Sequence, residues 1–90
     1  MTNQDEPPRE GEVTVRGLAS GFAQIVGIRS HRLIADEPLT LGGTDTGPTP
    51  YDLLLAALGT CASMTVGLYA RRKSWQLHDV AVRLRHSRVH

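Results

Sequence analysis

The sequence predicts an α+β protein in which an antiparallel β-meander is followed by one long buried central helix and a further strand. Apolar and polar residues alternate in residues 12–18 and again in residues 78–90, as they do in half-buried strands. Between these segments, residues 53–70 contain no charged side chain, which is typical of a helix enclosed on all sides. We therefore predict one small domain over residues 12–90, preceded by a disordered tail at residues 1–11.

The meander is predicted from three short segments. In residues 12–18, Val13 and Val15 fall on one face of the strand and polar residues on the other. Residues 22–28 and 31–35 have the composition of the two returning strands, and short Gly- and Ser-containing turns separate the three. The final strand, residues 78–90, is predicted to have one wet, basic face.

Residues 36–48 form a loop rich in Gly, Thr, Asp and Pro, and it is long for a compact domain. Gly42 and Gly47 have the outer spacing of a phosphate-binding loop, but Pro48 and Thr49 follow where that motif requires Lys and Ser or Thr. A phosphate site is therefore excluded. The acidic residues of this loop are interpreted as solvated turn residues: Asp36, Glu37 and Asp45.

A helix is predicted over residues 49–73. Thr49 can cap its first turn, Pro50 suits the first helical position, and Asp52 follows three residues after the cap. The three cations at residues 71–73 suit the negative end of a helix dipole. The uncharged run reaches the lower length limit of a membrane span. Because small and polar residues dilute the run, we favour a buried helix and expect no membrane.

Two faces of this helix differ in composition. Spacings of three and four residues place apolar side chains around the chain's only cysteine, and we call this set the Cys61 face: Leu54, Ala57, Leu58, Cys61, Thr65 and Leu68. A second set, the small-residue face, carries residues that let another helix approach closely: Ala56, Gly59, Ser63, Gly67 and Ala70. We therefore predict a homodimer whose central helices come together.

Composition excludes several classes of function. The net charge of +1 and the absence of aromatic residues among the basic ones give no support for nucleic-acid binding. One cysteine excludes an intrachain disulfide and suits a reducing compartment, and the acidic N-terminus is not a secretory signal, so we predict a cytoplasmic protein. His78, His86 and His90 lack the spacing of a compact metal site, and we expect neither metal nor cofactor.

Cys61 is the candidate nucleophile. It lies twelve residues beyond Thr49, out of reach of the positive end of the helix dipole. Thiolate character would have to come from a side chain that the fold brings in, and the candidates are arginines of the strand region: Arg16, Arg29 or Arg32. From the residues alone, the favoured interpretation is therefore a structural cysteine that acts as a small buried hydrophobe.

The segments GPTPYDLL (residues 47–54) and AALGTC (residues 56–61) resemble the OsmC/Ohr family, most of all the OsmC-like subgroup that occurs alone or fused to α/β-hydrolase domains. The resemblance spans residues 11–90. It implies a thiol-dependent peroxidase that reduces organic hydroperoxides in the oxidative stress response, as a swapped homodimer whose sheets enclose the central helices. It also implies that Cys61 is the catalytic cysteine, which attacks the peroxide O–O bond and becomes a sulfenic acid.

The sequence departs from the family pattern in three respects. Tyr51 stands where the peroxidases have a glutamate, with Asp52 one place later, and Arg16 is the candidate for the arginine that this glutamate holds. The family's resolving cysteine belongs to a second helix, so the chain resembles the N-terminal part of the domain. These departures imply an external thiol as reductant. They also favour an alternative, a redox-inactive dimerisation or ligand-binding module.

Overall fold

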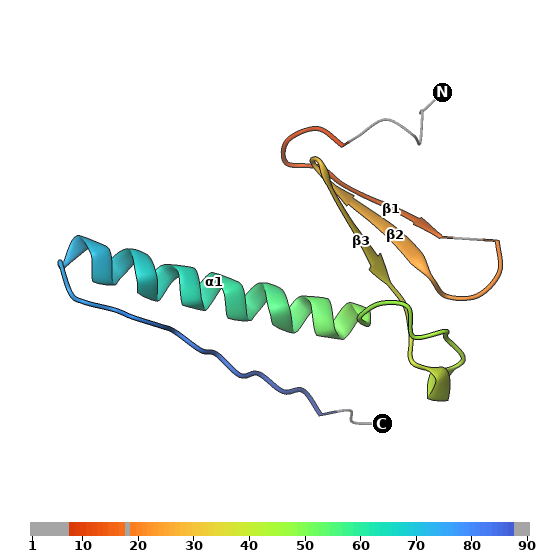
Figure 1. Ribbon diagram of the computed structural model, residues 1–90. Coiled ribbons are helices and arrows are strands. Elements are labelled where there is room, and N and C mark those ends of the chain that lie inside the picture. The colour runs from red at the N-terminus through yellow and green to blue at the C-terminus, as the bar shows by residue number, and fades with distance from the viewer. Residues whose placement is uncertain (1–7, 18, 88–90) are drawn as a thin grey trace. The chain divides into compact units, whose positions relative to one another are not determined.

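The computed structural model describes residues 8–17 and 19–87, which divide between two compact units, Met1–Pro50 and Tyr51–His90. The first unit holds a small sheet and the loop that follows it. The second holds one helix and an extended segment that runs back along it (Figure 1). The α+β class predicted from the sequence is confirmed.

The sheet is an antiparallel meander of three strands in the order β1-β2-β3, as predicted. The strands are β1 (Val13–Gly17), β2 (Gln24–Ile28) and β3 (His31–Ala35). Val15 pairs with Val26, and Val26 with Leu33, so these three side chains form an apolar row on one face. Only Val26 is buried, while Val15 is 62% and Leu33 42% exposed. The first unit therefore does not cover its own apolar row.

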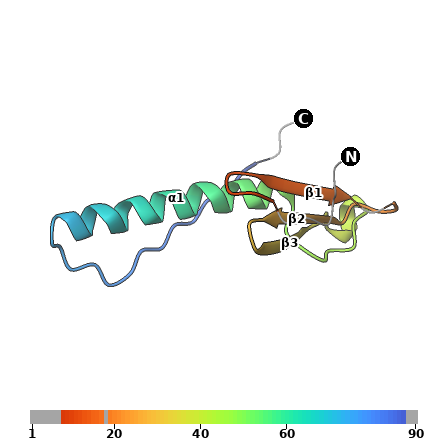
Figure 2. The ribbon, with the colours of Figure 1, turned by 90° about the horizontal axis from the view of Figure 1, so that it is seen from above.

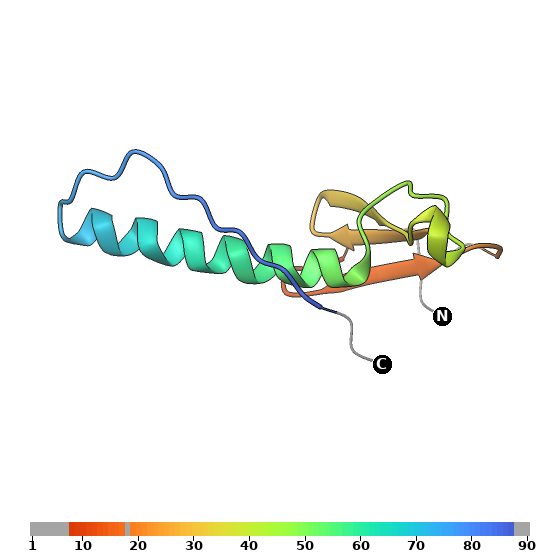
Figure 3. The same ribbon diagram turned by 90° about the horizontal axis from the view of Figure 1, so that it is seen from below.

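The loop after β3 is closely packed on its own backbone. It contains a 3₁₀ turn, η1 (Leu39–Leu41), before it leads into the helix (Figure 3). The Asp36 N–H donates to the Pro48 carbonyl at 2.9 Å, which closes the loop. A Cβ on Gly43 would overlap the Glu37 carbonyl, and one on Gly47 would overlap the Ile34 carbonyl. These two positions require glycine because the backbones approach too closely for any side chain.

The helix α1 (Pro50–Arg72) agrees with the predicted range to within one residue, with Asp52 in its first turn and cations in its last. It ends in a Schellman motif in which Ser74 adopts φ +57° and the Trp75 N–H donates to the Ala70 carbonyl at 2.9 Å. The Trp75 ring packs edge-on against Tyr69, with centroids 5.5 Å apart. This cap reverses the chain, and residues 75–87, the C-terminal segment, then return along the helix (Figure 2).

Two predicted features of the second unit are wrong for the single chain. The helix is not buried: only 11% of its most apolar 18-residue window is covered, because 90 residues supply too little chain to enclose it. Residues 78–87 are extended but form no strand. A strand needs a hydrogen-bonded neighbour as well as an alternating pattern, and the described part of this unit holds no other extended segment. Residues 88–90 lie outside the described residues.

The disordered tail at residues 1–11 stays a prediction for its larger part, because residues 1–7 lie outside the described residues. Within the described part, the Glu12 N–H donates to the Arg9 carbonyl at 2.9 Å and closes a turn immediately before β1.

Gly47 and Gly67 allow a matched test of these backbone constraints. We expect Gly47→Ala to lower the urea midpoint of unfolding, followed by far-UV circular dichroism, because the new Cβ would meet the Ile34 carbonyl. Gly67→Ala should raise helix stability by about 0.5–1 kcal/mol, because nothing lies within 4 Å of its Cβ position and alanine favours the helix. Equal effects of the two changes would contradict this description of the loop.

Candidate functional site

Cys61 lies in the middle of α1, and its side chain is exposed. Because Cys61 is exposed, it does not act as a small buried hydrophobe in the single chain. The neighbours on the Cys61 face are also open, with Leu54 55%, Leu58 53% and Leu68 47% exposed. The thiol therefore stands on an accessible, apolar and uncharged surface.

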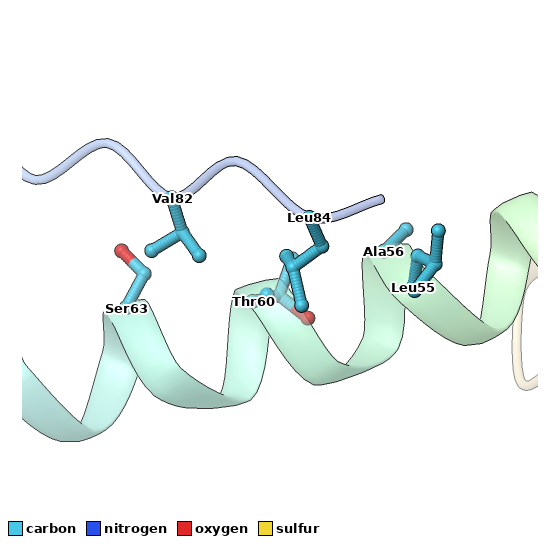
Figure 4. A pocket seen from close by; sticks show the side chains of 7 residues that line it. Leu55, Ala56, Thr60, Ser63, Val82 and Leu84 are labelled. Carbon is cyan, nitrogen blue, oxygen red and sulfur yellow. The ribbon is translucent and has the colours of Figure 1, made fainter. Parts of the chain in front are cut away.

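The opposite side of α1 is covered by the C-terminal segment. A shallow groove lies between the two, and Val82 and Leu84 reach from the segment toward the helix (Figure 4). Its helix wall is formed by Leu55, Ala56, Gly59, Thr60 and Ser63. Cys61 follows Gly59 by two positions, which is about 200° around the helix. The segment therefore leaves the Cys61 face free.

Tyr51, in the first turn of α1, contacts a residue of the C-terminal segment. The Tyr51 ring lies 5.3 Å from the His86 ring, centroid to centroid, at an interplanar angle of 30°. The contact joins the first turn of α1 to the far part of the C-terminal segment. Sequence reasoning missed it because the two residues lie 35 positions apart and no local pattern links them.

The predicted arginines all lie in the first unit. Arg16 is on β1, opposite Ile25, and Arg32 is on β3, opposite Gly27. Arg29 occupies the turn between β2 and β3 with a left-handed φ of +54°. Their relation to Cys61 stays a prediction. Because residues 53–70 carry no charge, any cation that acts on the thiol must come from outside this run of α1.

The loop holds the one acidic side chain that is fully enclosed in the described residues. Asp36 is 2% exposed, so its interpretation as a solvated turn residue is wrong. Its Oδ2 accepts from the Thr44 hydroxyl at 2.6 Å and the Thr46 hydroxyl at 2.7 Å, and also from the backbone N–H groups of both threonines. Its Oδ1 accepts from the Glu37 N–H at 2.7 Å. This carboxylate holds the loop that leads into α1.

These hydrogen bonds stabilise the charged form of Asp36. The Thr44 hydroxyl contributes most, followed by the Thr46 hydroxyl, and together with the backbone donors they hold the pKa of the Asp36 carboxyl well below its usual range. Burial acts in the opposite direction and is outweighed. No buried side-chain nitrogen or oxygen in the described residues lacks a hydrogen-bond partner, so the buried carboxylate is satisfied within the loop itself.

Two other kinds of site find little support. Within the described residues, no three His, Cys, Asp or Glu side chains gather as a metal site would require. The helix α1 is long and apolar enough to cross a membrane by length and composition alone, and one such helix is weak evidence of a membrane span.

Comparison with known proteins gives one match. A family model described as OsmC-like protein matches residues 43–90, which is more than half of the chain and includes all of α1 and the C-terminal segment. No curated protein and no solved structure matches the chain.

The Asp36 network predicts a dependence of stability on pH. The folded-state pKa is lowered, so the contribution is complete above the unfolded-state pKa of about 3.9 and is lost as the pH falls from there toward the native value. Asp36→Asn should therefore lower the urea midpoint at pH 7 and weaken the loss of stability in acid. Asp45→Asn is the matched control, because Asp45 is exposed in the same loop. Identical urea and acid titrations for the two variants would refute the role of Asp36.

Proposed function

Because the chain belongs to the OsmC family, we propose that it is a thiol-dependent peroxidase that reduces organic hydroperoxides, with Cys61 as the nucleophile. The observation that carries the proposal is the placement of Cys61, which is exposed at the middle of the family-matched helix, on the face that the C-terminal segment leaves open. Proteins of this family are generally soluble.

The first step of the proposed reaction consumes one Cys61 thiolate and one hydroperoxide. The Cys61 thiolate attacks one oxygen of the O–O bond, the bond breaks, and the leaving alkoxide takes a proton to give the alcohol. Cys61 is oxidised by two electrons to a sulfenic acid. Cys61 is the only cysteine of the 90 residues, so an external thiol then condenses with the sulfenic acid and releases water. A second equivalent of that thiol reduces the mixed disulfide and restores Cys61.

The surroundings of Cys61 favour an organic substrate. Leu54, Leu58 and Leu68 provide a partly exposed apolar surface beside the thiol, and residues 53–70 bring no charge to it. An alkyl or aryl group gains free energy by leaving water for such a surface, whereas hydrogen peroxide has no apolar part to bury.

We also propose a homodimer in the cytoplasm. The apolar row of the sheet is largely open in one chain, and a second copy would cover it, while the Cys61 face stays open to substrate. A free thiol suits a reducing compartment.

A second candidate is a redox-inactive dimerisation or ligand-binding module of the same family. It is favoured by Tyr51, which packs on His86 at the position where the peroxidases carry a glutamate. In this case Cys61→Ser would leave the biological activity of the protein unchanged.

The experiment that separates the two candidates measures oxidation of the thiol itself. Reduced protein is mixed with cumene hydroperoxide, and the oxidation state of Cys61 is followed by mass spectrometry. We expect sulfenic acid to form faster than in free cysteine, and faster than with hydrogen peroxide. The matched control carries Cys61→Ser and Ser63→Cys, which moves the thiol to the groove side of the same helix. A Cys61 rate equal to that of free cysteine would exclude the peroxidase.

A further inference from the structure

The last turn of α1 and the reversal that follows it bring aromatic rings and positive charges together (Figure 1). Residues 69–75 read YARRKSW, with three consecutive cations between two aromatic residues. The backbone fixes their arrangement, because the Lys73 N–H donates to the Tyr69 carbonyl at 3.1 Å and the Trp75 N–H to the Ala70 carbonyl at 2.9 Å. We call this cluster the aromatic–cationic cap: Tyr69, Arg71, Arg72, Lys73 and Trp75.

The rings of the cap are held in place although they are exposed. The Trp75 and Tyr69 rings meet edge-on with their centroids 5.5 Å apart, and the Lys73 Nζ lies over the Tyr69 ring, 5.6 Å from its centroid. Ala70, in the same turn, is the one buried residue of α1. Trp75 nevertheless remains 63% and Tyr69 46% exposed. These contacts order the two rings without covering them, so the cap presents a prearranged apolar surface to a partner.

The positive charge of the cap exceeds what the helix end requires. The dipole places about −0.5 of an elementary charge at the C-terminus of a helix. Three full cations stand there, and all three are exposed. Residues 53–78 contain no Asp or Glu that could balance them. The excess positive charge therefore favours an anionic partner.

The form of the cap favours a lipid surface over a nucleic acid or an enclosed ligand. The cap is the reversal of the chain at one end of the second unit (Figure 2), and none of its residues lines the groove of this unit. Nucleic-acid bases stack on open ring faces, whereas Lys73 lies over one face of Tyr69. Exposed Trp and Tyr beside Arg and Lys are typical of protein surfaces at the headgroup level of a bilayer, where the rings meet the apolar phase and the cations meet phosphate.

We propose that the aromatic–cationic cap binds the surface of membranes that contain anionic phospholipid. The Trp75 and Tyr69 rings lie at the level of the headgroups, and the three cations contact the lipid phosphate and carboxylate groups. The association is peripheral, so it differs from the membrane span that the sequence disfavours. A protein of the cytoplasm meets the leaflet that carries anionic lipid, and the inference does not depend on the chemistry of Cys61.

The test uses the full chain and the fluorescence of Trp75, which is its only tryptophan. The protein is titrated with vesicles of phosphatidylcholine and phosphatidylserine in equal parts, and separately with vesicles of phosphatidylcholine alone. Cosedimentation with the vesicles measures binding independently of the fluorescence. The cap variant carries Arg71→Gln and Arg72→Gln. The matched control carries Arg83→Gln and Arg85→Gln, which remove two exposed arginines from the C-terminal segment of the same unit.

We expect the vesicles that contain phosphatidylserine to bind the protein and to shift the Trp75 emission to the blue. Raising the salt concentration from about 0.05 M to about 0.5 M should reverse both effects. The cap variant should bind about 25-fold more weakly, which corresponds to about 1 kcal/mol for each cation removed, and the control less than about twofold more weakly. Lys73→Gln lies outside α1 and should weaken binding about fivefold, which keeps the test available if circular dichroism shows that the cap variant has lost its helix.

Three results would overturn the proposal. An equal loss of binding in the cap variant and the control would show that the cap is not the contact. Unchanged Trp75 emission with the anionic vesicles, or equal binding to phosphatidylcholine alone, would exclude an anionic lipid surface. A shift of the Trp75 emission with single-stranded DNA at the same phosphate concentration, and none with vesicles, would assign the cap to a nucleic acid instead.

Discussion

The uncharged surface of α1 is the constraint on which the rest of the structure depends. A helix without a charged side chain over residues 53–70 forgoes stabilisation wherever it faces water, because each half-exposed leucine forgoes part of the about 1.5–3 kcal/mol that full burial provides. The chain covers one side of this helix with its C-terminal segment and leaves the Cys61 face open. The open face thus provides the apolar setting of the thiol.

The loop before α1 differs from the helix, because its buried carboxylate finds its hydrogen-bond partners within the loop itself. Asp36 collects donors from Thr44, Thr46 and Glu37, and Gly43 and Gly47 allow the backbone to close around it. These contacts all lie within residues 34–48, and they hold the loop that leads into α1.

Local pattern predicted most of the fold. Alternation in residues 12–18 and the composition of residues 22–28 and 31–35 predicted the three strands. The run from Pro50 to the cations at residues 71–72 predicted the helix, because all of these signals depend on near neighbours in sequence. The enclosure of Asp36 could not be predicted, because Thr44 and Thr46 reach it only through a loop that includes φ +55° at Asp45. Alternation in residues 78–87 indicates which side chains share a face, but it could not indicate whether a strand lies beside them.

The candidate site, like the fold, could be predicted only in part from the sequence. Cys61 is identified from the residues around it and from the family resemblance, and the structure adds that it is exposed and faces away from the C-terminal segment. The contact of Tyr51 with His86 needed three-dimensional information, as did the fit of Leu84 over Gly59.

The central claim is that a second copy covers the apolar row of the sheet, and sedimentation velocity of the full chain in detergent-free buffer tests it most directly. The account predicts a species of twice the 9.8 kDa chain mass, with the helical circular dichroism of α1 retained. A species that stays at 9.8 kDa at every concentration, with the helix intact, would contradict it.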